Sequence, residues 1–239
     1  MVFITGAWEK EEDSLAILIP HKNKVSMDFT RAVYTIETPK SNAFLTLNHY
    51  GIDISRNELV ESALKLNTKY ILFWDTDVIP YSNNAILDLI EKANKFNLSI
   101  LSANYPSKRA IGLVNNKYAP SCWLYIEKEH KFLNGINDLT GIKEVDAVGL
   151  GFCLIRTDIF KDLSKPYFKY ITKYDNIEVK MGDYTFKGQD FSEDFYFCVN
   201  AKNHGYKVYY DFDTKCYHEF NGFINADGIV VNLTSSDDK

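Results

Sequence analysis

The fold can be worked out from one stretch, Tyr70-Ile-Leu-Phe-Trp-Asp-Thr-Asp-Val-Ile-Pro80. Five apolar or aromatic residues run directly into two carboxylates, Asp75 and Asp77, and a short run of this kind is typical of a buried strand. Because ionised carboxylates are costly inside a sheet, we expect both to lie where the strand ends. Ligands bind at that edge of an open α/β sheet. Two carboxylates this close together favour a hard divalent cation between them.

The Asp-x-Asp triplet carries little information by itself, because the chain contains a second one at Asp211 and Asp213. The context favours the first triplet: a hydrophobic strand precedes it, Pro80 follows it, and a helical pattern covers residues 82–96. The alternative is that Asp75 and Asp77 only mark the end of a strand. Their context makes a metal role the better hypothesis.

Strands and helices alternate over the first part of the chain. This alternation predicts a parallel sheet wrapped by helices. Ser55 and Glu58 form a capping-box pattern near the start of the second helix. The expected strands cover 15–20, 43–50, 70–74 and 99–105, and the expected helices cover 29–36, 56–66 and 82–96.

After Pro106 the pattern changes to shorter strands and turns. Residues 167–187 are aromatic and polar without a clear period, and they are our candidate for a mobile loop. Residues 225–239 are expected to form a polar tail with one apolar patch. The expected strands here cover 121–126, 143–148, 206–210 and 215–220, and the expected helices cover 157–163 and 192–205.

Composition excludes several classes of protein. The net charge of -5 makes nucleic acid a poor partner, and only Lys108-Arg109 approaches a basic patch. The four cysteines contain no Cys-x-x-Cys pair, so a zinc ribbon is not expected and a reducing compartment is the simplest assumption. With no signal-peptide pattern and no run long enough for a transmembrane segment, the protein is expected to be soluble and cytoplasmic. Peripheral docking on a membrane stays open.

Several polar segments stand in a characteristic order along the chain. Together they resemble the GT-A nucleotide-sugar glycosyltransferases, in particular the small family-2-like enzymes, over the range from Leu15 to Phe220. The resemblance implies a single α/β, Rossmann-like GT-A domain with a mostly parallel central sheet, helices on both faces and a smaller antiparallel part on the acceptor side. The segments that carry it are Arg56-Asn57, Asp75-Thr-Asp77, Gly149-Leu-Gly151, Ser192-Glu-Asp194 and His218-Glu219.

The resemblance also implies how the domain is divided and what it binds. Residues 1–224 would form the domain, with a nucleotide-binding half at 1–105, an acceptor-side half at 106–224 and a C-terminal tail at 225–239. The donor would be a UDP- or GDP-sugar held with Mn²⁺ or Mg²⁺, which suits oxygen ligands and one imidazole. Asp77 would bind the metal directly, Asp75 would face the ribose or the metal, and His218 would be the third ligand. His218 could instead be an ordinary surface or core histidine.

The catalytic base is expected to be Asp194, which would take a proton from the acceptor hydroxyl in an inverting reaction. Glu193 is the less favoured holder of that role. The alternative for both is ordinary helix capping, because Ser192-Glu-Asp opens a helix and acidic residues stabilise a helix N-terminus.

Four further residues are expected near the donor. Arg56 would hold the nucleotide or its phosphates, or would be a surface helix charge. Pro20 and His21 end the first strand, where this fold places the nucleobase and ribose. Gly151 would let the chain pass close to the donor sugar, or would form a plain β-bulge.

The sequence therefore predicts an enzyme, a metal-dependent glycosyltransferase acting on a glycan, protein or lipid hydroxyl. One alternative is a non-catalytic nucleotide-sugar-binding protein of the same fold, and another is a retaining transferase. A nucleotidyltransferase is disfavoured, because the first strand is followed by His21-Lys-Asn-Lys24 and not by a Gly-rich phosphate loop.

Overall fold

The computed structural model describes residues 2–5, 13–22, 24–48, 51–108, 118–129, 131–134, 140–181, 184–187, 190–220 and 222–231. Its helices are α1 (Met27–Thr35), α2 (Ile52–Leu64), α3 (Ala85–Phe96) and α4 (Glu193–Asn203), with 3₁₀ turns at Glu127–Glu129 and Thr157–Lys161. Its strands are β1 (Val2–Thr5), β2 (Leu15–His21), β3 (Asn42–Asn48), β4 (Tyr70–Trp74), β5 (Val78–Pro80), β6 (Ile100–Asn104), β7 (Cys122–Ile126), β8 (Lys131–Leu133), β9 (Ile142–Val145), β10 (Ala147–Val148), β11 (Phe152–Arg156), β12 (Glu178–Met181), β13 (Tyr184–Lys187), β14 (Val208–Phe220), β15 (Gly222–Ile224) and β16 (Val230–Val231).

The central sheet is mixed, which corrects the prediction of a mostly parallel one. Its order is β1-β3-β2-β4-β11-β6-β14-β15-β16. The pairs β2–β3, β2–β4 and β6–β14 are parallel, whereas β11 lies antiparallel between β4 and β6. Between β6 and β11, strand β9 also joins this sheet, where it pairs antiparallel with β14.

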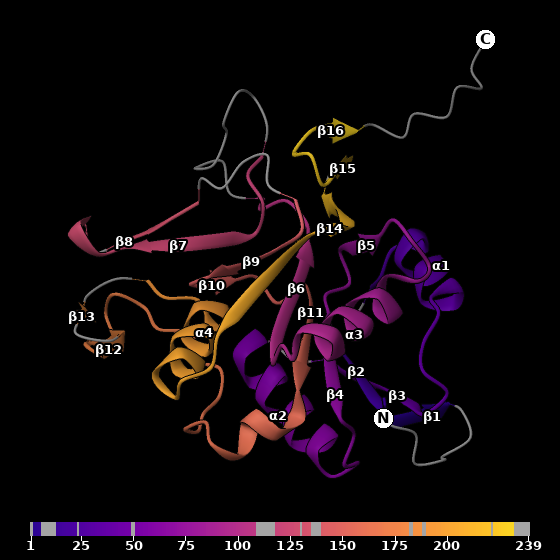
Figure 1. The fold of residues 1–239 in the computed structure, drawn as a ribbon, viewed down its shortest axis with the longest axis horizontal. Helices are drawn as coiled ribbons and strands as arrows, with labels where there is room; N and C mark the ends of the chain where they lie inside the picture. Colours follow the sequence, from indigo (N-terminus) through magenta and orange to yellow (C-terminus); the bar gives the residue numbers. More distant parts are fainter. Residues whose placement is uncertain are drawn as a thin grey trace.

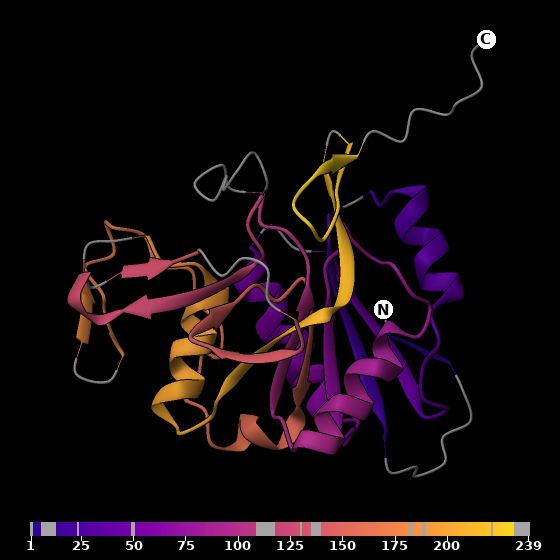
Figure 2. The same cartoon turned by 45° about the horizontal axis from the view of Figure 1, so that its top comes forward.

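Helices cover both faces of this sheet, as predicted (Figure 1). One buried cluster contains Leu59 of α2 and Phe197 of α4, and the other contains Phe29 of α1 and Leu89 of α3. The turned view in Figure 2 shows the sheet lying between the two helical layers. Because β4 is buried on both faces, all five of its side chains are inaccessible to solvent. The two carboxylates, Asp75 and Asp77, follow its last residue.

Three local predictions are wrong. Helix α2 begins at Ile52 after Gly51, so Ser55 is not its N-cap, and the Ser55 hydroxyl donates to the Gly51 carbonyl oxygen instead (3.0 Å). The helix expected at 157–163 is a short 3₁₀ helix at Thr157–Lys161. The loop expected at 167–187 contains a pair of strands, because Glu178–Met181 pairs with Tyr184–Lys187, and Tyr167, Phe168 and Ile171 within it are buried.

The expected C-terminal tail is also part of the sheet as far as Val231. Residues 222–224 pair with β14 and with β16. The backbone N–H of Ala226 donates to the Tyr81 hydroxyl (2.8 Å), and that of Tyr118 donates to the Gly228 carbonyl (2.7 Å). Residues 232–239 of the tail, and Arg109 of the expected basic patch, lie outside the described residues. No helix in the described part of the chain is long and apolar enough to cross a membrane.

Candidate functional site

Several of the predicted site residues lie where strands reach one edge of the sheet. Leu18 of β2 lies beside Phe73 of β4 in parallel register, so Pro20 and His21 end next to Asp75. His218 of β14 lies opposite Val78 of β5, directly after Asp77. The sheet therefore brings segments from the start, middle and end of the chain to one edge.

Asp77 faces His218 and Lys108. Lys108 Nζ lies 2.6 Å from Asp77 Oδ2, and His218 Nε2 lies 3.6 Å from the same oxygen. The other ring nitrogen of His218, Nδ1, is 2.6 Å from the carbonyl oxygen of Pro106. A carbonyl can only accept, so Nδ1 carries a proton and Nε2 is left to face the carboxylate. Burial would raise the pKa of Asp77, but His218 and Lys108 outweigh it and hold that pKa well below its usual range.

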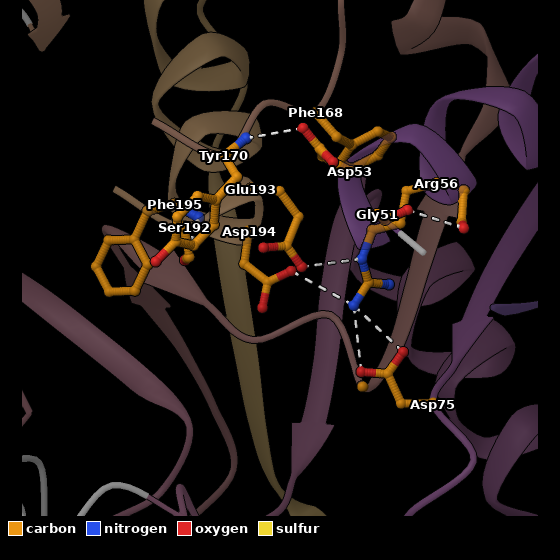
Figure 3. Close-up of polar contacts among 12 residues, drawn as sticks. Gly51, Asp53, Arg56, Asp75, Phe168, Tyr170, Ser192, Glu193, Asp194 and Phe195 are labelled. Carbon is orange, nitrogen blue, oxygen red and sulfur yellow. Dashed lines mark hydrogen bonds and ion pairs between the residues drawn. The ribbon is translucent and has the colours of Figure 1, made fainter. Parts of the chain in front are cut away.

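Arg56 is itself buried and lies at the centre of a group of carboxylates (Figure 3). Its Nη2 lies 3.2 Å from both oxygens of Asp75, its Nε lies 3.4 Å from Glu193 Oε1, and its Nη2 lies 3.5 Å from Asp194 Oδ1. One guanidinium thus links the end of β4 to the start of α4. Arg56 is therefore not a surface charge: its Nε and Nη2 contact the protein's own carboxylates, while its buried Nη1 has no hydrogen-bond partner among the described residues.

The carboxylate cluster, which we define as Asp75, Asp77, Glu193 and Asp194, contains more carboxylates than there are cations beside it in the described part of the chain. Among the described residues, the permanent cations in contact with it are Arg56 and Lys108. Burial raises the pKa of Asp75, and burial together with Glu193 raises that of Asp194 well above its usual value, even though Arg56 opposes both shifts. The cluster therefore favours added positive charge, either protons or a cation.

The donor atoms fit a divalent cation in part. Among the described residues, no three His, Cys, Asp or Glu side chains are already grouped as a metal site. Asp77 and His218 face each other across 3.6 Å, a separation close to that of two ligands of one ion. Metal-binding histidines usually donate their other N–H to a carbonyl or carboxylate, as His218 does to Pro106. Asp75 is turned towards Arg56, so the predicted set of Asp75, Asp77 and His218 is only partly assembled.

The start of α4 holds its two acidic residues in different surroundings. Ser192 is the N-cap, and its hydroxyl accepts a hydrogen bond from the Phe195 N–H, as the capping alternative requires. The Glu193 side chain is 9% exposed and bound to Arg56, whereas the Asp194 side chain is 22% exposed. Asp194 is therefore the one that a ligand from solvent can reach, which fits the preference for it over Glu193 as the base.

Gly149 and Gly151 lie under the ring of Tyr105. The Gly151 N–H donates to the Tyr105 hydroxyl (2.8 Å), and the Gly151 carbonyl accepts from the Asp75 N–H (2.8 Å). A Cβ at Gly149 would lie 2.2 Å from the Tyr105 hydroxyl oxygen. Packing thus explains both glycines without a donor sugar, and they form a turn into β11, not a β-bulge.

We expect Gly149→Ala to lower the free energy of unfolding by about 1–3 kcal/mol, because the methyl group overpacks a buried contact. Tyr105→Phe removes the clashing oxygen, so the double variant should lose less stability than the sum of the two single variants. Urea denaturation of the four proteins measures this coupling. Simple additivity would show that the hydroxyl is not what excludes a side chain at Gly149.

The sequence did not predict that Lys108 contacts Asp77 or that Tyr105 contacts Gly151. It also predicted a nucleotide-binding or surface role for Arg56, and not its contacts with three carboxylates. Lys108 could have been found, because it follows β6, whose carboxyl end reaches the same edge as that of β4. Nothing local indicates that Tyr105 covers the Gly149–Gly151 turn. His21 lies partly exposed at the edge and Pro20 is buried, so nucleotide binding at these two residues stays a prediction.

Comparison with known proteins identifies a fold but no family. No protein-family model matches the chain, and no curated protein matches it. Among solved structures, A197 from STIV superposes with a TM-score of 0.59 at 16% identity, over 92% of this chain and 94% of that chain. The likeness therefore shows a shared general α/β fold over nearly the whole length of both proteins.

Proposed function

We propose that this protein is a GT-A, family-2-like glycosyltransferase that moves a sugar from a nucleotide-diphosphate donor to a hydroxyl acceptor with the help of Mn²⁺ or Mg²⁺. The observation that supports this most is the gathering of Asp75, Asp77, His218 and the Glu193-Asp194 pair at one sheet edge, from segments far apart in the sequence. Their unbalanced negative charge is what a site for a cation and a diphosphate requires.

In this proposal Asp77 and His218 would hold the cation, which would neutralise the charge that develops on the leaving diphosphate. Asp77 suits this part because its lowered pKa keeps it ionised near neutral pH. Lys108 sits on the same oxygen and would be released towards the phosphates when the cation binds. Asp75 stays on Arg56 and would face the ribose.

Asp194 would accept the proton of the incoming hydroxyl. Its carboxylate shares the Arg56 guanidinium with Asp75, so the base and the donor-binding carboxylate are held at a fixed spacing. Its raised pKa makes it a better proton acceptor than an ordinary surface carboxylate. An inverting reaction follows if the hydroxyl approaches from this side.

Replacing Asp77 by alanine should abolish cation-dependent donor binding, because the variant loses the ionised ligand opposite His218. Calorimetry with UDP-glucose, UDP-galactose, UDP-N-acetylglucosamine and GDP-mannose, each with Mn²⁺ and with EDTA, measures this. We expect one donor to bind with Mn²⁺ only, and affinity to fall by at least about 100-fold in the variant.

Asp213→Ala is the matched control, because Asp213 belongs to the other Asp-x-Asp triplet and is exposed. It should bind the donor like the wild type. If the donor still binds in EDTA and in Asp77→Ala, donor binding does not require a metal ion. Binding of no donor would remove the transferase itself and leave Asp75 and Asp77 as the end of a strand.

Two alternatives share the donor site. A non-catalytic nucleotide-sugar-binding protein would bind the donor but never release its sugar. A retaining transferase would turn over without needing Asp194. The partial exposure of Asp194 and its raised pKa favour the inverting enzyme over both.

A further inference from the structure

A second pocket lies on the other face of the two strands that carry Asp77 and His218. Tyr217 pairs with Ile79, and His218 pairs with Val78. Neighbouring residues of a strand point to opposite faces, so Tyr217 and Ile79 face away from the carboxylate cluster and towards α1. Figure 1 shows α1 beside β5 at this place. We call this the α1 pocket, and its volume is about 350 Å³.

Tyr81 forms a fixed aromatic platform in the α1 pocket. Its ring stacks on Tyr217 with 4.1 Å between centroids, its N–H donates to the Lys215 carbonyl (3.0 Å), and its hydroxyl accepts from the Ala226 N–H (2.8 Å). Burial raises the pKa of the Tyr81 hydroxyl to about 12, yet 42% of the residue is exposed. The hydroxyl end is thus anchored while the ring stays open to solvent, so a ligand meets a surface that is already ordered.

The polar groups of the α1 pocket are electrically balanced. Asp28 and Arg31, both on α1, form an ion pair (2.5 Å), and Asn83 lies at the other side. A paired carboxylate and guanidinium offer acceptors and donors side by side, which suits neighbouring hydroxyl groups, since each can donate and accept. A phosphate would be repelled by the Asp28 carboxylate, and a purely apolar ligand would make no use of these polar groups.

We propose that the α1 pocket binds the pyranose ring of a neutral sugar, with the C–H face of the ring on Tyr81 and its hydroxyls on Asp28, Arg31 and Asn83. The volume is at the lower end of the range for small-molecule sites, which fits one or two sugar units. The pocket contains no residue of the carboxylate cluster. It is therefore a holding site for sugar and not a reaction site, and it does not depend on the proposed transferase activity.

Saturation-transfer NMR of the full chain tests this with glucose, galactose, mannose, N-acetylglucosamine, maltose and cellobiose. We expect transfer to the protons of at least one sugar. Tyr81→Ala should weaken sugar binding by about tenfold or more, since it removes the stacking surface. Arg31→Ala, a change at an exposed side chain, should also weaken binding and leave the fold intact.

Tyr34→Ala is the matched control, because Tyr34 is an 87% exposed tyrosine of α1 outside the pocket, and it should bind sugar like the wild type. EDTA and Asp77→Ala should also leave sugar binding unchanged, which separates this pocket from the donor site. The proposal is overturned if no sugar binds, or if binding survives both Tyr81→Ala and Arg31→Ala.

Discussion

Replacing Arg56 by methionine is expected to lower the free energy of unfolding by about 3–5 kcal/mol near pH 7, the cost of breaking a buried ion pair by removing one partner. Arg56 is 1% exposed and contacts Asp75, Glu193 and Asp194. Methionine fills much of the same space over the Phe73 ring, so little of the loss should come from a cavity. What remains is a group of like charges, one buried and two half-buried, without its counter-charge.

The loss should grow with pH, and the sign follows from proton linkage. Without Arg56 the folded-state pKa values of Asp75 and Asp194, already raised, rise further above those of the unfolded chain. Between the unfolded and folded pKa values the folded form binds more protons, so stability falls as pH rises through that window. The stability difference between variant and wild type should therefore be smaller at about pH 5 than at about pH 8.

Urea denaturation of both proteins at the two pH values measures this. Arg31→Met is the matched control, because Arg31 is an exposed arginine that also pairs with an aspartate, and its loss should change stability by no more than about 0.5 kcal/mol. A cost for Arg56→Met below about 1 kcal/mol, or one independent of pH, would mean that the three carboxylates do not depend on this guanidinium.

The strand at Tyr70–Trp74 and the place of its carboxylates could be predicted because both are local. A fully apolar run must be buried, and charges must then follow its end. The start of α4 was predictable for a similar reason, since Ser192 satisfies N–H groups that every helix start leaves open. Helices on both faces of the sheet could be predicted from the alternation of strand and helix patterns along the chain.

The direction of β11 and the partners of Arg56 could not be predicted, because both depend on contacts between distant segments. The sequence of β11 is equally consistent with a parallel and an antiparallel buried strand. Its direction is determined by its pairing with β4 and β6. Arg56 lies on a helix with polar neighbours, which is equally consistent with an exposed charge. It is buried against Phe73 and Asp75 from β4 and its end, and against the start of α4, and no local pattern encodes those contacts.

Asp194→Asn is expected to lower the rate of sugar transfer by about 100-fold to 10,000-fold, the usual contribution of a general base. Asparagine keeps the size of the side chain and cannot take up a proton near neutral pH. Donor binding should be unchanged, because Asp75, Asp77 and His218 are intact. Release of nucleoside diphosphate from whichever donor binds, with water as the acceptor, gives the rate before any natural acceptor is known.

Glu193→Gln separates catalysis from charge balance, because both variants remove one negative charge beside the same guanidinium. If Asp194 is the base, Glu193→Gln keeps most of the rate and Asp194→Asn loses it. The reverse result would move the base to Glu193, whose 9% exposed side chain would then have to leave Arg56 to meet a hydroxyl. Equal rates in both variants and the wild type would favour a retaining reaction, because no carboxylate at the start of α4 would then act on the acceptor.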